Sequence, residues 1–506
     1  MNNKIIAAII VVIVIVVAAA AVLTVGSDDR EGPGIEKGVY PTNLMILGNA
    51  NLDDYLDEED VAYIQKIIGT DYSYSKEYFC DANYDGVIDE KDVSYVNSMI
   101  AGDWDSIRYC YYLDANFRIS SYDMSVDDRH VVTLICPPLD DILLLNPDLL
   151  VGTDMRPIQG KYLPQYEGIL SEIESRNGIE LVNVGVASDP DIEKLSQLSK
   201  DNGGHLTVVC GDDSYGPGME KLLAGSGVQV VRIPTWEYGG TLPGLLTLAF
   251  ILDVDDSDGH KEMETALAYR DWYQEIERDV QDAVAQVPED QRPGVSCVYA
   301  YIDPMQILGS YTGEYNNSMK LRIEDVTDAY MHGTATGGHG NQIDTEVVSE
   351  LVTNYGLDVL VGMVGAPFQI EDNQYGNGGG PSSAQGSYQA MKDTYDKWMR
   401  QVGAALGDDG ASLVITGYSF FSGISEPLGQ LILGYYLYSD TVDAFNLEYL
   451  EQKVNEYCEW IGIYDIDGDG NSTPVDDNGR PYEWNYDCMN LLYAGEDNPK
   501  NIMNRL

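Results

Sequence analysis

One long amphipathic segment divides the strand pattern of this chain in two. From about residue 261 to residue 287, apolar residues mostly recur at four-residue steps, with Asp, Glu and Arg between them. This spacing predicts a single helix of about 40 Å, at 1.5 Å per residue. On either side of it, short β-branched runs alternate with helical patterns, which is typical of parallel sheets covered by helices. The sequence therefore predicts two α/β lobes joined by one stiff helix that keeps a cleft mostly preformed.

The predicted strands and helices form one set before the long helix and one set after it. The strands of the first set are residues 131–135, 181–184, 206–210 and 228–233, with helices at 191–198 and 218–223. The strands of the second set are residues 295–299, 358–361 and 413–416, with helices at 345–352 and 388–406.

Charge and composition exclude several classes of protein. The 506 residues include 83 acidic and 29 basic side chains, which gives a net charge of −54. A general nucleic-acid binder is excluded because phosphate contacts need clustered Lys and Arg. The seven cysteines show no CxxC or Cys/His ligand spacing, so we expect no zinc ribbon and no disulfide-dense scaffold. Most of the cysteines are expected to be small buried hydrophobic residues.

An uncharged apolar tract of 21 residues spans positions 5–25. It is long enough to cross a bilayer core of about 30 Å, whereas a cleavable signal has an apolar region of about 7–15 residues. Lys4 precedes the tract and acidic residues follow it, which predicts a single-pass anchor at the cell membrane, with the bulk of the chain extracellular or periplasmic. The alternative is a signal cut within residues 18–21.

Two loops near the N-terminus carry oxygen-bearing side chains at the spacing of a calcium loop. Loop 81–92 has a glycine, Gly86, at position 6, where the chain must turn sharply around the ion. Loop 49–60 repeats the pattern 32 residues earlier, but has Asn49 at position 1 and Asp54 at position 6. The predicted calcium ligands are Asp81, Asn83, Asp85, Val87, Asp89 and Asp92 in one loop, and Asn49, Asn51, Asp53, Tyr55 and Asp60 in the other.

Each of these loops runs into an amphipathic helix, at residues 61–68 and 93–100. Duplicated loop–helix units that end in Asp rather than Glu resemble a type I dockerin, over residues 43–103. The resemblance implies a small all-α module that folds around calcium and binds a cohesin domain. Alternatively, the module only folds on calcium and spaces the next domain from the membrane. A third loop, 465–476, favours calcium over a plain acidic turn, with ligands Asp465, Asp467, Asp469, Asn471 and Asp476.

The two-lobe region contains several short motifs in a fixed order, including RHVVTLICPP at 129–138, DLLVGTD at 148–154 and GTATGGHGNQIDTEVVSEL at 333–351. These motifs resemble those of the substrate-binding proteins of ABC importers for iron–siderophore, haem and cobalamin. Their order and spacing cover about residues 106–464. The resemblance implies capture of a metal chelate (a corrinoid, a haem or a ferric siderophore) and its delivery to an ABC permease.

The expected domains follow from these patterns. They are a transmembrane anchor or signal at 1–26, a linker at 27–42, the dockerin-like module at 43–103, an N-terminal lobe at 104–259, the interlobe helix at 260–290, a C-terminal lobe at 291–464, and an extension with a calcium-like loop at 465–506.

The chelate is expected in the cleft, outside the carboxyl ends of the strands. Aromatic rings suit a large planar or macrocyclic ligand, because Tyr and Trp present an apolar face with a polar tip. The first lobe offers Pro138, Asp212, Tyr215, Trp236 and Tyr238. The second lobe offers Tyr301, Tyr311, Tyr315, His339, Phe368, Tyr418, Phe420 and Phe421.

The chemistry of the chain favours some ligands over others. With five histidines, it has too few for a bare zinc or manganese site. An anionic siderophore would need a basic cleft, for which the candidates are Arg156, Arg232, Lys320, Arg322 and Arg400. Because the chain is so acidic, a corrinoid or haem-like chelate is preferred, with His339 a candidate axial ligand.

In this family an acidic residue on each lobe docks onto arginines of the permease. The matching positions are Glu193 and Glu346, each at a predicted helix start, where a carboxylate also compensates the helix dipole. The phrase LLLNPDLLVG allows another alignment, which moves the first acid to Asp140 or Asp141.

An enzyme is not predicted. Neither GYSFF nor SYGPG is a GxSxG nucleophile elbow, and the chain has no P-loop and no GxGxxG motif. The remaining alternative is a calcium-dependent cell-surface scaffold that acts through the dockerin-like module and transports no ligand.

Overall fold

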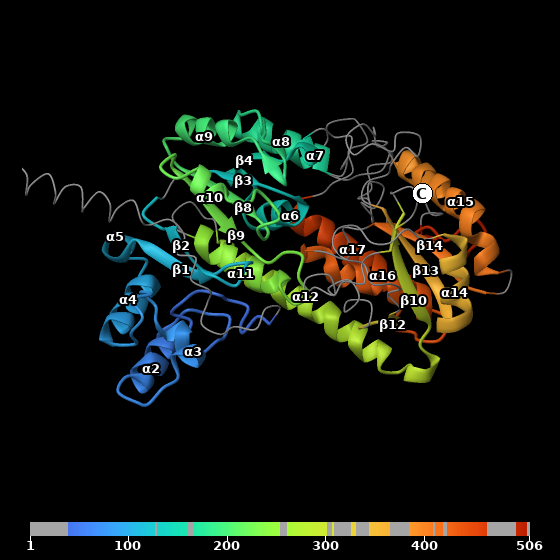
Figure 1. Cartoon of the computed structure of the whole chain (residues 1–506), viewed down its shortest axis with the longest axis horizontal. Coiled ribbons are helices and arrows are strands. Elements are labelled where there is room, and N and C mark those ends of the chain that lie inside the picture. Colours follow the sequence, from blue (N-terminus) through green and yellow to red (C-terminus); the bar gives the residue numbers. More distant parts are fainter. Residues whose placement is uncertain are drawn as a thin grey trace, which may run out of the picture.

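A computed structural model describes residues 39–126, 129–158, 166–253, 261–300, 306–307, 325–329, 344–364, 384–407, 410–417, 423–462 and 492–502. These residues form two α/β lobes joined by one long helix, with a small helical module packed against the first lobe (Figure 1). The predicted two-lobe α/β fold is confirmed at this level.

The sheet of the first lobe has five parallel strands in the order β5-β4-β3-β8-β9. The strands are β3 (Val131–Thr133), β4 (Leu150–Thr153), β5 (Val182–Asn183), β8 (Leu206–Cys210) and β9 (Val228–Arg232). Its helices are α6 (Cys136–Leu145), α7 (Met155–Ile158), α8 (Glu167–Asn177), α9 (Ile192–Asp201) and α10 (Met219–Leu222). A short pair, β6 (Gly185–Val186) and β7 (Asp189–Pro190), leads into α9.

The second lobe is built on three parallel strands, β10 (Gly294–Tyr299), β13 (Leu357–Val364) and β14 (Ser412–Gly417). The short β11 (Gln306–Ile307) and β12 (Asp328–Ala329) pair with β10, antiparallel and parallel respectively. The helices α14 (Thr345–Tyr355) and α15 (Ala384–Leu406) pack on each other, and α15 also packs on β14.

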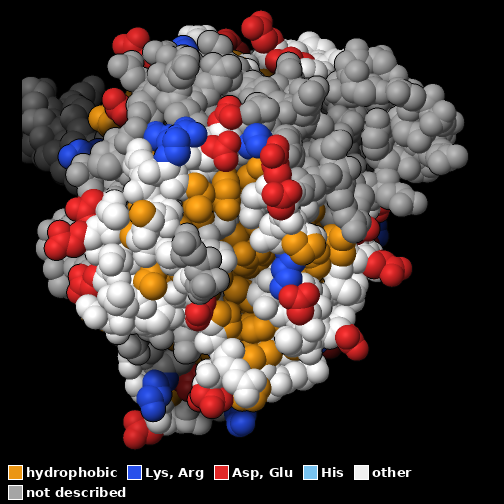
Figure 2. Space-filling model, turned by 90° about the vertical axis from the view of Figure 1, so that its right-hand side faces the viewer, with side chains coloured by type: hydrophobic (Ala, Val, Ile, Leu, Met, Phe, Trp, Pro, Cys, Tyr) orange, Lys and Arg blue, Asp and Glu red, His pale blue; other side chains and the backbone are white. Residues whose placement is uncertain are grey.

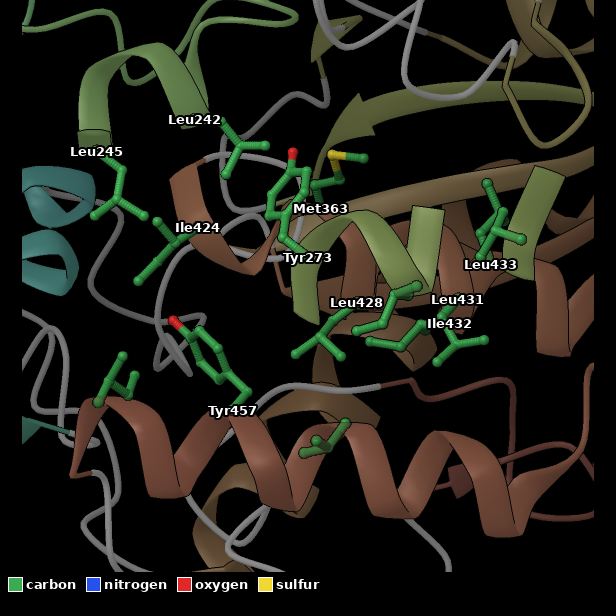
Figure 3. Packing of buried hydrophobic residues seen from close by; sticks show 14 of the residues in the cluster. Leu242, Leu245, Tyr273, Met363, Ile424, Leu428, Leu431, Ile432, Leu433 and Tyr457 are labelled. Atoms are coloured by element: carbon green, nitrogen blue, oxygen red, sulfur yellow. The ribbon is translucent and has the colours of Figure 1, made fainter. Parts of the chain in front are cut away.

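The predicted interlobe helix is α12 (Glu262–Val284), whose 23 residues span about 34 Å. It buries Ala266, Tyr269, Tyr273, Ile276 and Val280, which form one face. That face packs against α11 (Thr241–Leu252) of the first lobe and α16 (Glu426–Tyr438) of the second. Figure 3 shows side chains from these helices and from α17 (Leu447–Ile461) gathered at the junction of the lobes. Because α11 and α16 are apolar on nearly all sides, they form the buried centre of the molecule.

The N-terminal module contains α2 (Glu58–Ile67), α3 (Tyr74–Glu77), α4 (Glu90–Ile100) and α5 (Trp104–Ile107). The helices α2 and α4 begin three residues before the predicted starts. The reason is a capping box at each start, in which Asp57 pairs with Asp60 and Asp89 with Asp92. The last positions of each calcium-like loop are therefore the first turn of a helix. The two calcium-like loops also share a backbone feature. Leu52 and Tyr84, both at loop position 4, have positive φ angles of 62° and 54°.

A two-stranded hairpin of β1 (Tyr109–Leu113) and β2 (Ile119–Asp123) follows the module. The segment 45–47 of the module pairs with β1, through an isolated bridge between Ile46 and Tyr112. The module therefore shares backbone hydrogen bonds with the structure that follows it in sequence.

Two predictions concern features that the described residues only partly cover. None of the helices among them has the length and apolarity needed to cross a membrane, and the tract 5–25 lies outside them. All six cysteines within the described ranges are free, and five of them are buried, as predicted.

Candidate functional site

The segments that follow the carboxyl ends of the strands of both sheets meet at the junction of the lobes. In the first lobe, β3 passes through Ile135, with φ of 73°, into α6. In the second lobe, Gly423 has φ of 65° and lies against Pro137, so that an added Cβ would stand 2.8 Å from the Pro137 Cβ. The Gly423 N–H also donates to the carbonyl of Thr235, 3.1 Å away, just after β9. Because ligands of open α/β sheets bind outside the carboxyl ends of the strands, this junction is the candidate site.

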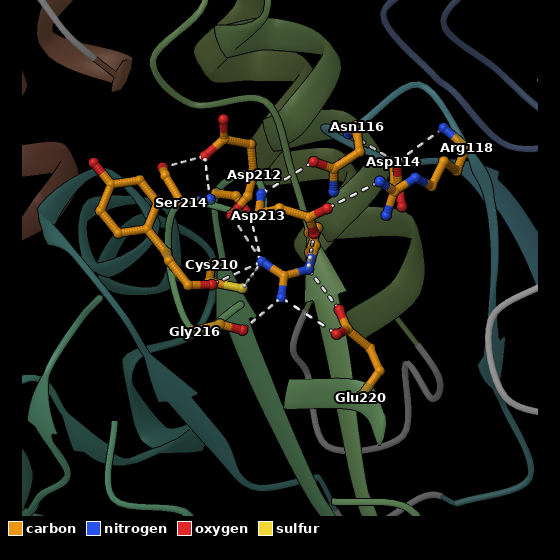
Figure 4. A network of polar contacts seen from close by, with 12 residues as sticks. Asp114, Asn116, Arg118, Cys210, Asp212, Asp213, Ser214, Gly216 and Glu220 are labelled. Carbon is orange, nitrogen blue, oxygen red and sulfur yellow. Dashed lines mark hydrogen bonds and ion pairs between the residues drawn. The ribbon is translucent and has the colours of Figure 1, made fainter. Parts of the chain in front are cut away.

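The loop 211–216, after β8, is held by Arg232 at the end of β9 (Figure 4). The Arg232 side chain is 3% exposed and forms an ion pair of 2.5 Å with Glu220. Its guanidinium donates to the carbonyls of Asp212, Tyr215 and Gly216 at 2.8, 2.8 and 3.0 Å. Arg232 therefore fixes the shape of the loop, and the prediction that it serves as a cleft cation is wrong because its donors are spent on the loop and on Glu220.

A second arginine at this edge is engaged in the same way. The Arg156 guanidinium lies 3.0 Å from the carboxylate of Asp154, which is fully buried after β4. Asp154 also accepts from the backbone N–H of Ile135, at 2.8 Å. This pair therefore stabilises the turn from β3 into α6 and offers a ligand little net positive charge.

A buried carboxyl group connects the lobes. Asp140 on α6 accepts from the hydroxyl of Tyr166, before α8, at 2.5 Å, and from that of Tyr457, on α17, at 3.4 Å. Burial raises the pKa of Asp140 to about 7, although both tyrosine hydrogen bonds oppose the rise. The neighbouring Asp141 is 2% exposed, one of its carboxyl oxygens has no hydrogen-bond partner, and burial holds its pKa well above the usual value.

Further hydrogen bonds cross the junction. The Tyr238 hydroxyl, after β9, donates to the carboxylate of Asp325 at 2.9 Å, and Gln430 on α16 donates to the same carboxylate at 3.0 Å. The hydroxyl of Tyr269 on α12 donates to the carbonyl of Ile424, at 3.0 Å. These contacts and the packing of α12 against α11 and α16 restrict movement between the lobes.

The predicted ligand residues of the first lobe fall on three neighbouring segments. Pro138 is buried inside α6, Asp212 and Tyr215 are half-buried in loop 211–216, Trp236 is half-buried and Tyr238 is 36% exposed. The predicted residues of the second lobe, Tyr301, Tyr311, Tyr315, His339, Phe368, Tyr418, Phe420 and Phe421, lie outside the described residues, as do Lys320 and Arg322.

The two predicted docking acids are both exposed in the first turn of a helix. Glu193 lies in α9, which is capped by Asp191, and Glu346 lies in α14, which is capped by Asp344. The alternative positions Asp140 and Asp141 are buried and cannot contact a permease in this arrangement. Figure 2 shows an apolar band on the end of the molecule formed by the second lobe, with Asp and Glu as well as Lys and Arg side chains along its edges.

The calcium-like loops wrap around buried acidic side chains. Asp60, Asp81 and Asp92 are fully buried, and burial raises the pKa of Asp60 and of Asp92 to about 6. Asp81 accepts from the Tyr74 hydroxyl at 2.5 Å and from the Gly86 N–H at 2.9 Å. Over the described residues, no three His, Cys, Asp or Glu side chains are grouped as a metal site. The calcium ligands stay a prediction, and loop 465–476 lies outside the described residues.

The sequence of α6 contains one signal for the buried site, carried by the same two acids that the sequence offered as alternative docking positions. In the helix CPPLDDILLL, two adjacent acids interrupt an otherwise apolar run, and such charges are rarely buried without a partner. The partners Tyr166 and Tyr457 are 26 and 317 residues away in sequence, so no local pattern links them to Asp140.

Comparison with known proteins gives similarity to solved structures alone. No family model matches the chain, and no curated protein does. A TroA-like periplasmic binding protein from Veillonella parvula is 14% identical, with a TM-score of 0.49, over 69% of this chain and 95% of that one. An ABC transporter solute-binding protein from Sulfurospirillum deleyianum is 13% identical, with a TM-score of 0.46, over 70% and 95%. The two-lobe architecture rests on the strands and helices described above.

Proposed function

We propose that the chain is an extracytoplasmic substrate-binding protein that captures a metal chelate between its lobes and delivers it to an ABC importer. The observation that carries the proposal is the meeting of Pro137, Thr235 and Gly423, from the carboxyl-end segments of two parallel sheets, beside a single connecting helix. Such an arrangement places loops of both lobes around one point while the helix limits their relative motion.

A weakly charged chelate suits the first lobe better than an anionic siderophore. Its two candidate cations, Arg156 and Arg232, are paired with Asp154 and Glu220. The aromatic side chains of loop 211–216 and of the segment after β9 are Tyr215, Trp236 and Tyr238, and the loop also carries Asp212 and Asp213. A corrinoid or a haem presents the large apolar faces on which such rings stack. His339 stays a candidate axial ligand.

Glu193 and Glu346 are proposed as the permease contacts, one on each lobe. Their exposure at helix starts supports this role, since an exposed carboxylate can form a bidentate pair with a permease arginine. The apolar tract 5–25 would keep the protein at the membrane beside its permease.

Calcium is proposed as a structural ion of the N-terminal module. In loop 49–60, the Asn49 Nδ2 group donates to the carbonyls of Leu44 and Asp53, both at 2.7 Å, while its Oδ1 is buried without a donor. In loop 81–92, the buried carboxylates of Asp81 and Asp92 have no cationic side chain among their hydrogen-bond partners. Buried oxygen atoms that lack a donor or a cationic partner are suited to bind a hard cation such as calcium.

The alternative is a cell-surface scaffold that acts through the dockerin-like module. It is supported by the outward faces of α2 and α4, on which Gln65, Lys66, Ser94 and Asn97 are exposed and open to a cohesin-like partner. In this alternative no solute binds between the lobes.

A binding screen separates the two functions. Haemin, cyanocobalamin and ferrioxamine B are each titrated into the full-length chain, with tryptophan fluorescence and visible absorbance as readouts. The proposed function predicts saturable 1:1 binding of at least one chelate, with haemin or cyanocobalamin preferred to ferrioxamine B. Absence of saturation for all three, together with capture of a cohesin domain, would favour the scaffold.

A further inference from the structure

The β1–β2 hairpin is shared between the calcium-loop module and the first lobe. On the module side, the Leu47 N–H donates to the Tyr111 carbonyl at 2.8 Å, and the Leu113 N–H donates to the Met45 carbonyl at 2.9 Å. On the lobe side, the Tyr122 hydroxyl lies 2.6 Å from the Thr207 hydroxyl on β8. The hairpin is therefore a physical link between the two parts of the chain.

The tip of the hairpin is closed by hydrogen bonds to one buried carboxylate. The Asp114 side chain, 4% exposed, accepts from the backbone N–H groups of Asn116 and Arg118 at 2.8 and 3.0 Å. It also accepts from the Ser120 hydroxyl at 2.9 Å. These three bonds close the turn around the carboxylate, as short polar side chains do in Asx-type turns.

The tip contacts the loop that carries two of the proposed ligand residues (Figure 4). The Asn116 Oδ1 atom accepts from the Asp213 N–H at 3.0 Å, and the Arg118 guanidinium lies 2.9 Å from the Asp213 carboxylate. The Ala115 N–H donates to the carbonyl of Arg232, 3.2 Å away. The loop 211–216 is therefore held from one side by the Arg232 side chain and from the other by the hairpin tip.

We propose that Asn116 and Arg118 are positioning residues for solute binding, and that the module braces loop 211–216 through the hairpin. The inference rests on the proposed function, in which Asp212 and Tyr215 meet the chelate. Its physical basis is local stability: a loop opens less often when each of its contacts is tied to an ordered element. Calcium that orders the module would then also stabilise loop 211–216, because β1 connects the two. By thermodynamic linkage, a chelate bound at the loop would in turn increase the affinity of the module for calcium.

Hydrogen exchange of the full-length chain, read by mass spectrometry on peptides covering 211–216, tests the brace without any chelate. The double variant Asn116→Ala/Arg118→Gln is expected to exchange about three- to tenfold faster in this loop, because one hydrogen bond and one ion pair are lost. The conservative variant Asn116→Asp/Arg118→Lys is expected to restore most of the protection. The matched control is Arg176→Gln, which removes two ion pairs of similar exposure, with Asp148 and Glu172, on another part of the lobe.

The brace is overturned if the double variant exchanges in this loop as wild type does, or if the control accelerates it equally. A second arm adds calcium to wild type. Slower exchange in the loop, lost in the double variant, supports the coupling to calcium, whereas calcium binding without any change in the loop contradicts it. Calorimetry on the same sample identifies a failure of calcium binding itself, which removes the calcium step from both proposals. Failure of the chelate screen leaves the exchange result unaffected, so the two proposals fail separately.

Discussion

Asp54, at the sixth position of the first calcium-like loop, forms an ion pair of 2.7 Å with Arg270 on the interlobe helix. The two side chains are 20% and 12% exposed, so the pair is largely shielded from water. Arg270 also lies over the ring of Tyr55, the next residue of the loop. A loop position that calcium loops reserve for glycine is used here to attach the module to the helix that joins the lobes.

Replacing Arg270 by Gln is therefore expected to destabilise the whole chain. It removes the ion pair with Asp54 and an exposed one with Asp271, and leaves the partly buried Asp54 carboxylate with less compensation, which lowers the free energy of unfolding by about 1–2 kcal/mol. Urea unfolding followed by tryptophan fluorescence measures the loss. The control Lys261→Gln removes an exposed pair with Glu264 and is expected to cost less than about 0.5 kcal/mol. Equal effects of the two variants would show that the Asp54 contact adds nothing.

The buried Asp140 predicts a specific dependence of stability on pH. Its pKa is raised to about 7 in the folded state, so between about pH 4 and pH 7 the folded chain keeps a proton that the unfolded chain has lost. Stability from this group is therefore fully present below about pH 4 and is lost as pH rises to about 7. Asp140→Asn should flatten that decline by up to about 1.4 kcal/mol per pH unit. Urea midpoints at several pH values measure it, and parallel curves for wild type and variant would refute the assignment.

Gly423 tests the contact between the lobes. In Gly423→Ala the new Cβ would meet Pro137 of the other lobe at 2.8 Å, at a φ angle that L-residues rarely adopt. Gly356→Ala is the matched control, because its φ of 70° is similar and nothing lies within 4 Å. Both variants lose stability through backbone strain, but Gly423→Ala should lose about 1–3 kcal/mol more, from overpacking. Thermal unfolding measures the difference, and equal losses would mean that the lobes do not touch here.

Calcium should stabilise the chain through loop 81–92. A ligand that binds the folded state alone raises the unfolding temperature, so added calcium should raise it and a chelator should reverse the rise. Asp92→Asn should remove most of the effect, whereas Asp105→Asn, on the exposed surface of α5, should keep it. Differential scanning fluorimetry with and without calcium provides the comparison. A wild-type chain that does not respond to calcium would contradict the proposed site.

The sequence predicted the long helix and the main strands because their signals are local. The apolar spacing along α12 and the β-branched runs of β8 and β10 each lie within one element. It also suggested Arg232 as a cleft cation, which was wrong because the fold packs Glu220 and four loop carbonyls around its guanidinium. Contacts of this kind depend on tertiary packing, which the spacing of apolar residues along the sequence does not predict.

The attachment of the module to the interlobe helix could not be predicted from the sequence, for the same reason. In the sequence, Asp54 only indicated a weaker match to a calcium loop, because glycine is expected at that position. Its partner Arg270 lies 216 residues later. The hairpin that joins module and lobe follows the module directly, but it carries no motif that distinguishes a brace from a linker.

The most direct test of the central claim is a chelate titration that locates the binding point. Haemin and cyanocobalamin are titrated into wild type, Tyr215→Ala and the control Tyr355→Ala, which changes an exposed residue on α14. We expect saturable 1:1 binding of one chelate to wild type, weakened about tenfold by Tyr215→Ala and unchanged by Tyr355→Ala. No saturable binding by wild type, or equal weakening by both variants, would contradict solute capture between the lobes.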